Sequence, residues 1–318
     1  MNSDYRSGAL FAIPLIRRSL LSSAALLTGL GAVPLPFVQA AAESPAPETH
    51  LGEFPLANGT TLSIERRGQV VLFGLNRPHI HNRIDPVTYR ALATAYYEYD
   101  HDPSLRAAVL FGHGDHFSRG IDIDAFKSLA ATQQPWLTGQ ETIDPLAKRQ
   151  PFLSKPLVVA VHGDTWNMAH EIFLVGDIRV AAADTNFGQD ENTHGLFPGG
   201  GSTVRFVREA GWGDAMRYML TGDHWTAAEA YRMGTVQEVL ATADAALERA
   251  IELAGKIADC GPLGIKTTLA SARLAVDPVE AAALAQLDAR FGALFHTRDF
   301  QERLDAEAEG RRPVYQGK

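Results

Sequence analysis

Two glutamates, Glu171 and Glu191, lie twenty residues apart in the part of the chain best suited to chemistry. Each stands beside a glycine turn, Gly163 before the first and residues 199–201 after the second. Such turns can expose backbone N–H groups to a ligand. Two carboxyl groups that converge on one pocket can hold a water molecule and transfer protons in both directions. This chemistry suits the addition of water across an activated double bond.

Considered singly, each glutamate has an ordinary structural explanation. Glu171 borders an apolar helical segment, where a carboxylate is either a solvated edge residue or a buried functional acid. Glu191 lies in the polar run 189–192, which alone is typical of a surface loop. The choice between structure and catalysis therefore depends on the segments that position the two residues.

Short apolar runs rich in β-branched residues predict buried strands at 70–73, 108–111, 157–161 and 178–181. Helices are predicted between them, one beginning at Asp85-Pro86 and another at the capping box 226–229. The first helix has an apolar face made of Val87, Ala91, Leu92, Ala95, Tyr96 and Tyr99. From Ala243 onward the pattern is almost wholly helical, so the fold class is α/β with a helical C-terminal region.

The composition limits the classes of partner. The chain has 318 residues, and its 46% hydrophobic and 21% charged content is typical of a soluble globular protein. The net charge is −8, and because residues 1–40 carry +2, the remainder carries about −10. Such an acidic body is a poor partner for nucleic acid or anionic membrane. Cys260 is the only cysteine, so no intrachain disulfide can form.

The N-terminal 40 residues predict an export signal. Arg17-Arg18 precedes a moderately apolar run from Leu20 to Val38, and small residues follow from Ala40. This order indicates a twin-arginine signal with cleavage near Ala40, and therefore a periplasmic protein. Glycines and prolines interrupt the run, which argues against stable membrane insertion. The alternative is an N-terminal extension without a targeting role, which leaves the protein cytoplasmic. Residues 41–55 have the composition of a linker.

Five segments in consistent order resemble the crotonase (enoyl-CoA hydratase/isomerase) family. They are residues 75–82, 108–122, 155–171, 187–201 and 220–234. The resemblance implies a spiral core of ββα units at residues 56–250. It also implies a C-terminal helical region at 251–318 that packs against neighbouring subunits in a homotrimer or hexamer.

The resemblance also implies an enoyl-CoA hydratase, which adds water across a 2-enoyl thioester. Its substrate carries CoA, and no further cofactor is expected. Glu171 and Glu191 would be the catalytic acids, and the backbone N–H groups of Arg119 and Met168 would form the oxyanion hole. The other residues expected to contact the substrate are Gly120, Ile121, Asp122, Gly199 and Trp136.

Some features depart from the family pattern. Arg119 stands where a small residue is usual, and residues 167–169 are Asn-Met-Ala where three glycines are usual. Export would also separate the enzyme from CoA esters, which are cytoplasmic. Two alternatives therefore stay open. One is a cofactor-free hydrolase of cyclic β-diketones on the same fold, whose histidine would come from His162, His170 or His194. The other is a catalytically silent exported binding protein.

Histidine spacings at His79-x-His81 and His113-x-x-His116 could suit a metal ion. Both pairs fall in predicted turns, and no third ligand is evident from the sequence. The sequence therefore predicts no metal site.

Overall fold

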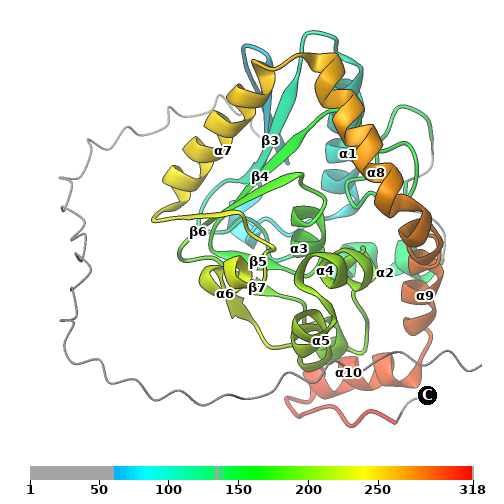
Figure 1. Cartoon of the computed structure of the whole chain (residues 1–318). Coiled ribbons are helices and arrows are strands. Elements are labelled where there is room, and N and C mark those ends of the chain that lie inside the picture. Colours follow the sequence, from blue (N-terminus) through cyan, green and yellow to red (C-terminus); the bar gives the residue numbers. More distant parts are fainter. Residues whose placement is uncertain (1–60, 133–135, 138, 317–318) are drawn as a thin grey trace, which may run out of the picture. The chain divides into compact units, whose positions relative to one another are not determined.

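The computed structural model describes residues 61–132, 136–137 and 139–316 (Figure 1). The predicted export signal at 1–40 and the predicted linker at 41–55 lie outside the described residues. The described part is an α/β fold with a main sheet, a small second sheet and a helical C-terminal region. This agrees with the predicted fold class.

The main sheet has six strands in the order β1-β2-β3-β4-β6-β9. The β1–β2 pair is antiparallel and every later pair is parallel. Alternate side chains face opposite layers, so Val71 and Phe73 of β2 enter one core while Val70 and Leu72 enter the other. The strands are β1 (Leu62–Arg67), β2 (Val70–Leu75), β3 (Ala107–Gly112), β4 (Leu157–Val161), β6 (Ile178–Ala182) and β9 (Glu238–Leu240).

The second sheet contains β5 (Asp164–Trp166), β7 (Asn186–Gly188) and β8 (Trp225–Thr226). Its strands repeat one unit, because β4 is followed by β5 and a helix, and β6 is followed by β7 and a helical turn. β5 and β7 pair in parallel, and a parallel bridge joins Ser118 to Thr165. The chain therefore stacks successive strand–strand–helix units side by side, which places their corresponding turns together.

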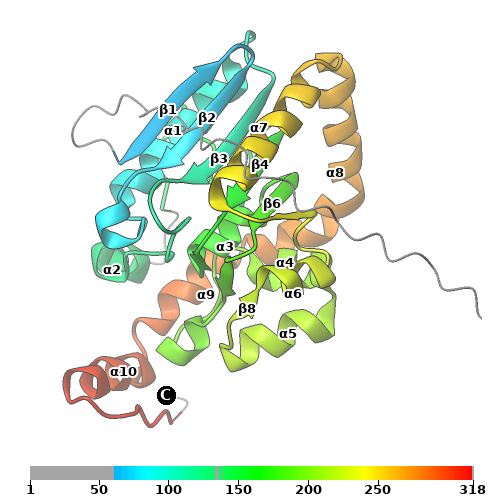
Figure 2. The same ribbon diagram turned by 90° about the vertical axis from the view of Figure 1, so that its left-hand side faces the viewer.

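Helices cover both faces of the main sheet. Figures 1 and 2 show α7 (Ala243–Ala258) along one face and α1 (Pro86–His101) on the opposite side. α1 begins as predicted, with the Asp85 side chain accepting a 2.8 Å hydrogen bond from the Thr88 amide. Of the predicted apolar face, Leu92, Ala95, Tyr96 and Tyr99 are buried, Ala91 is half-buried, and Val87 is exposed. The predicted end of the spiral core at residue 250 falls inside α7.

Three C-terminal helices follow, α8 (Pro262–Leu284), α9 (Leu287–Leu294) and α10 (Arg298–Ala308). The last two pack on their own chain, because Phe291 of α9 contacts Trp136 and Phe300 of α10 is buried against Phe295. After α10, the Tyr315 hydroxyl donates a 2.8 Å hydrogen bond to the Thr193 carbonyl. Within the described residues, no helix is long and apolar enough to cross a membrane.

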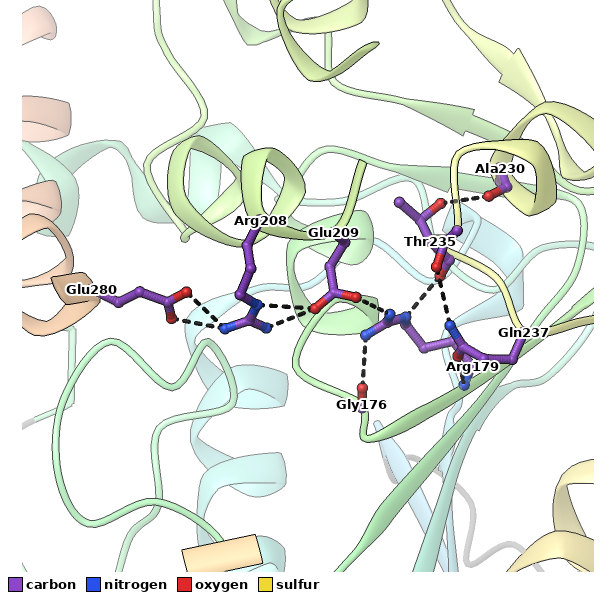
Figure 3. A network of polar contacts seen from close by, with 9 residues as sticks. Gly176, Arg179, Arg208, Glu209, Ala230, Thr235, Gln237 and Glu280 are labelled. Atoms are coloured by element: carbon purple, nitrogen blue, oxygen red, sulfur yellow. Dashed lines mark hydrogen bonds and ion pairs between the residues drawn. The ribbon is translucent and has the colours of Figure 1, made fainter. Parts of the chain in front are cut away.

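A polar network fixes α8 and α4 (Ser202–Ala210) to the main sheet (Figure 3). Arg179 of β6 is buried and donates to the carbonyls of Gly176 and Thr235 at 3.0 and 2.7 Å. It also pairs with Glu209 at 2.7 Å. Arg208 extends the network from Glu209 to Glu280 of α8. A buried guanidinium is tolerated here because its donors are satisfied.

Candidate functional site

Glu171 is buried on α3 (Met168–Phe173), and its carboxylate is held by backbone amides from α4. Its Oε1 accepts hydrogen bonds from Gly200 N at 2.6 Å and Ser202 N at 3.3 Å. The start of a helix offers unpaired amides and a favourable dipole to an anion. A Cβ added at Gly200 would collide with Glu171 Oε2, so glycine is needed there for this close approach.

Glu191 begins the short 3-10 helix η2 (Glu191–His194) and is also buried. Its Oε1 accepts a 2.8 Å hydrogen bond from the side-chain amide of Gln189. Its Oε2 is buried and has no hydrogen-bond partner among the described residues. A buried, unpartnered carboxyl oxygen is costly for stability, and such atoms are common where a substrate or water binds.

The two carboxyl groups have unequal electrostatic surroundings. Burial raises the pKa of Glu171, although hydrogen bonds from the amides of Ser202 and Gly200 oppose that rise. Burial raises the pKa of Glu191 well above its usual value, and the negative charge of Glu171 raises it further. Glu171 is therefore the better carboxylate and Glu191 the better proton carrier. Pairs of acids whose surroundings separate their pKa values commonly divide acid and base roles.

Gln189 connects Glu191 to the protein interior. Its Oε1 accepts hydrogen bonds from Ser202 Oγ at 2.5 Å and from His170 Nδ1 at 2.6 Å, which leaves its amide group to hold Glu191. Burial lowers the pKa of His170 to about 4, so the ring is neutral near pH 7. Aromatic rings surround it, including those of Phe206 and Trp225.

The predicted oxyanion donor at Arg119 is wrong, because its amide already donates a 3.0 Å hydrogen bond to the His81 carbonyl. The neighbouring Ile121 amide is better placed. The Ile84 amide donates to the Gly120 carbonyl, and the Asp122 amide donates to the Ile84 carbonyl. Because the carbonyl and the N–H of one trans peptide point in opposite directions, the Ile121 N–H points away from Ile84.

Ile121 and Met168 lie on adjoining segments. A Cβ on Gly120 would stand 2.6 Å from the Trp166 carbonyl oxygen and 3.3 Å from Met168 N. Neither the Ile121 amide nor the Met168 amide has a hydrogen-bond partner among the described residues. Two free amides on adjoining segments are the arrangement that an oxyanion hole requires.

The other predicted substrate contacts have structural partners. Asp122 is the N-cap of α2 (Ile123–Ala131), and the Arg119 guanidinium pairs with Asp164 Oδ2 at 2.7 Å. Gly199 packs against the ring of Phe291, where a Cβ would come within 2.8 Å. Trp136 is buried against the same ring rather than exposed on a loop. Substrate contact by these residues stays a prediction.

The histidines of the alternative β-diketone mechanism do not share one position. His162 Nε2 lies 2.8 Å from the Gly114 carbonyl oxygen, His170 bonds Gln189, and the partly exposed His194 lies 3.6 Å from Asp190 Oδ1. No cluster of three or more His, Cys, Asp or Glu side chains within the described residues is arranged to hold a metal ion.

Sequence reasoning missed Asn167, Gln189 and Ser202, although each lies next to a predicted element. For Gln189 the sequence did carry a signal, because this polar residue lies two positions before Glu191 in the same polar run. Each of these side chains also bonds a residue 13 to 23 positions away in the chain, and no local pattern records such a contact.

A cavity of about 550 Å³ lies apart from this site. It is lined by residues of β4, α4 and α8, among them Leu157, Arg205 and Val276, and by neither Glu171 nor Glu191. Charged groups on its wall, such as Arg179 and Glu209, are already paired with each other (Figure 3). The carboxyl pair and the free amides, rather than the size of this cavity, identify the candidate site.

Comparison with known proteins adds independent information. Residues 65–318 match the family model described as enoyl-CoA hydratase/isomerase. Enoyl-CoA hydratase EchA19 of Mycobacterium tuberculosis is 36% identical over 269 residues, which cover 82% of this chain and 98% of that protein. The 2,3-dehydroadipyl-CoA hydratase of Escherichia coli is 32% identical, with coverage of 81% and 99%.

Solved structures give the same result. A probable enoyl-CoA hydratase/isomerase from Mycobacterium abscessus superposes with a TM-score of 0.67 at 40% identity, covering 81% of this chain and 99% of that one. A carnitinyl-CoA hydratase from Mycobacterium avium gives a TM-score of 0.70 at 28% identity, again covering 81% and 99%.

Proposed function

The chain belongs to the enoyl-CoA hydratase/isomerase family, and from this premise we propose that it hydrates 2-enoyl-CoA thioesters. The observation that carries the proposal is the buried carboxyl pair, in which Glu171 is held by two amides while one oxygen of Glu191 is unpartnered. An isomerase needs one acid to move a proton, whereas hydration uses a base for water and an acid for carbon. The presence of both glutamates therefore favours hydration.

The thioester carbonyl binds between the amides of Ile121 and Met168. When a nucleophile attacks Cβ, the π electrons move toward the carbonyl and negative charge collects on its oxygen. Fixed N–H donors stabilise that charge by about 3–4 kcal/mol per donor in comparable sites. The Met168 amide lies at the start of α3, where the helix dipole adds to this effect.

The two glutamates then transfer the protons. Glu171, as the carboxylate, accepts a proton from the water whose oxygen bonds Cβ. Glu191, as the acid, gives its proton to Cα through Oε2, the oxygen without a protein partner. The product is a 3-hydroxyacyl thioester, and the proton left on Glu171 must pass to solvent or to Glu191 before the next cycle.

Crotonyl-CoA is the direct test substrate, because loss of the conjugated enoyl absorbance reports hydration. Glu171→Gln and Glu191→Gln should each lower kcat by about 10²–10⁴-fold, the usual contribution of a general acid or base. Glu252→Gln, the same change at an exposed acid of α7, is the matched control and should keep wild-type turnover. Near-normal turnover by both site variants would refute the proposed roles.

The proposal extends to assembly and location. A homotrimer or hexamer is supported by the exposed apolar side chains Trp212, Leu263 and Leu274, and light scattering of the purified protein measures the mass directly. Periplasmic location rests on Arg17 and Arg18. Replacing both arginines with lysine should retain the protein in the cytoplasmic fraction. Unchanged fractionation would contradict export by the twin-arginine route.

A further inference from the structure

Asn167 and Asp190 form a reciprocal pair of hydrogen bonds between two units of the spiral. Asn167 Nδ2 donates to Asp190 Oδ1 at 2.7 Å, and the Asp190 amide donates to Asn167 Oδ1 at 2.9 Å. The Asn167 amide also donates to the Gly188 carbonyl at 2.8 Å. The β5–β7 pairing ends at Trp166 and Gly188, so these bonds continue the connection one step beyond the strands.

Each member of the pair immediately precedes a residue of the candidate site. Asn167 is the N-cap of α3 and is followed by Met168, whose amide has no acceptor among the described residues. Asp190 is followed by Glu191, whose Oε2 has no hydrogen-bond partner in the same part of the chain. A shift of either partner would therefore move an oxyanion donor relative to the acid.

The backbone at Asn167 also needs support. Its φ of 53° and ψ of −121° lie in a region that side chains other than glycine rarely adopt. This is one of the positions where the resemblance calls for glycine. Holding asparagine in this conformation requires contacts that oppose relaxation, and both ends of its side-chain amide are engaged by Asp190.

Asp190 is itself anchored from other elements. Its carboxylate lies 3.6 Å from His194 Nε2 and 3.5 Å from His224 Nε2. His224 in turn contacts Asn186 of β7, with 3.3 Å between His224 Nδ1 and Asn186 Nδ2. Asp190 is thus connected through His224, which directly precedes β8, to Asn186 of β7.

We propose that Asn167 and Asp190 are a matched pair of positioning residues that fix the Met168 amide relative to the Glu191 carboxyl group. The catalytic part of this inference rests on the proposed function. The mechanical part does not, because coupling between the two segments exists with or without a substrate.

Kinetics test the catalytic part. Asn167→Gly keeps a residue suited to the backbone conformation but removes both side-chain bonds, and Asp190→Ala removes the acceptor. Each should lower kcat for crotonyl-CoA on the order of tenfold to a hundredfold, the scale of a small misplacement of reacting groups, with KM little changed. The double variant should be no worse than the poorer single variant, because both changes break one connection.

Two further variants separate positioning from general destabilisation. Asp190→Asn keeps an oxygen that can accept from Asn167 Nδ2, so it should recover most of the kcat that Asp190→Ala loses. Asp223→Ala, at an exposed acid paired with Arg217, is the matched control and should leave kcat unchanged. Wild-type kcat in Asn167→Gly, or equal loss in Asp190→Asn and Asp190→Ala, would overturn the proposal.

Amide hydrogen exchange tests the mechanical part without substrate. Asp190→Ala should speed exchange in residues 164–175, and Asn167→Gly should speed exchange in residues 186–196, on the opposite segment in each case. Exchange that changes only around the substituted residue would overturn the coupling. If exchange is coupled but the protein does not hydrate crotonyl-CoA, the mechanical role of Asn167 and Asp190 stands and the proposed function fails.

Discussion

Glu171 and Glu191 are buried so close together that the charge of the first raises the pKa of the second. Burial raises the pKa of both. The amides of Ser202 and Gly200 oppose that rise at Glu171, and the hydrogen bond from Gln189 opposes it at Glu191. The charge of Glu171 adds to the effect of burial at Glu191, whose pKa is raised well above its usual value. Such coupled acids titrate as a pair.

Removing the charge of Glu171 should change the pH dependence of Glu191. In Glu171→Gln the carboxylate that raises the pKa of Glu191 is gone, so that pKa should fall. Because Glu191 must be protonated to act as the acid, the alkaline decline of the residual kcat/KM should move to lower pH. A pH–rate profile of wild type and Glu171→Gln measures this shift. An alkaline limb at the same pH in both proteins would contradict the coupling.

The buried Glu191, the proposed catalytic acid, should reduce stability as the pH rises. The folded-state pKa of Glu191 is raised above the unfolded value, which is about 4.3 for a free glutamate. Between these two values the folded protein binds more protons than the unfolded chain, so stability falls as the pH increases. Glu191→Gln removes this loss, and its Tm should exceed that of wild type by an amount that grows with pH above about 4.3.

Thermal unfolding from acid to neutral pH, in parallel with Glu252→Gln, checks this prediction. Glu252 is exposed, and hydrogen bonds from Lys256 and Arg249 lower its pKa, so its replacement should not raise Tm. A pH-independent Tm difference for Glu191→Gln would show that the pKa of Glu191 is the same in the folded and unfolded states, which would contradict this prediction.

Gly200 should not tolerate a side chain. Gly200→Ala would place a methyl group against Glu171 and within 2.9 Å of Leu146, which should cost about 1–3 kcal/mol of stability as overpacking. Displacement of the Glu171 carboxylate should also lower the turnover of crotonyl-CoA. Gly213→Ala is the matched control, since nothing lies within 4 Å of its Cβ position. Denaturant unfolding and crotonyl-CoA turnover measure both effects, and equal behaviour of the two variants would contradict the close approach.

The identity of the first oxyanion donor can be tested atom by atom. Replacing the Ile121 amide with an ester removes one N–H and should lower kcat by about 10²–10³-fold, the usual effect of losing one such donor. An ester at Arg119 removes the hydrogen bond to the His81 carbonyl and should mainly lower stability. A larger loss of kcat for the ester at Arg119 than for the ester at Ile121 would support Arg119 as the donor, as the sequence predicted.

The sequence predicted four of the six strands of the main sheet and the start of α1, because each depends on a local pattern. Asp85 caps its own helix and the strand side chains alternate over a few residues. The error at Arg119 has a different origin. Which amide of residues 119–121 is free depends on pairing with His81 and Ile84, and that register comes from tertiary contacts.

The hydrogen-bond partners of each glutamate could not be predicted from a local sequence pattern either. Glu171 is held by amides about thirty residues later in the chain, and Glu191 by Gln189, whose orientation depends on His170 and Ser202. Residue type suggested the chemistry, but the different hydrogen-bond partners of the two acids come from the fold.

The hydrogen bond from the Tyr315 hydroxyl to the Thr193 carbonyl joins the segment after α10 to the short helix that carries Glu191. α9 reaches Gly199 in the same way through Phe291. The C-terminal segments therefore form part of the wall around both glutamates. Deleting residues 287–316 should leave the main sheet folded but remove the packing against Gly199 and the hydrogen bond to Thr193.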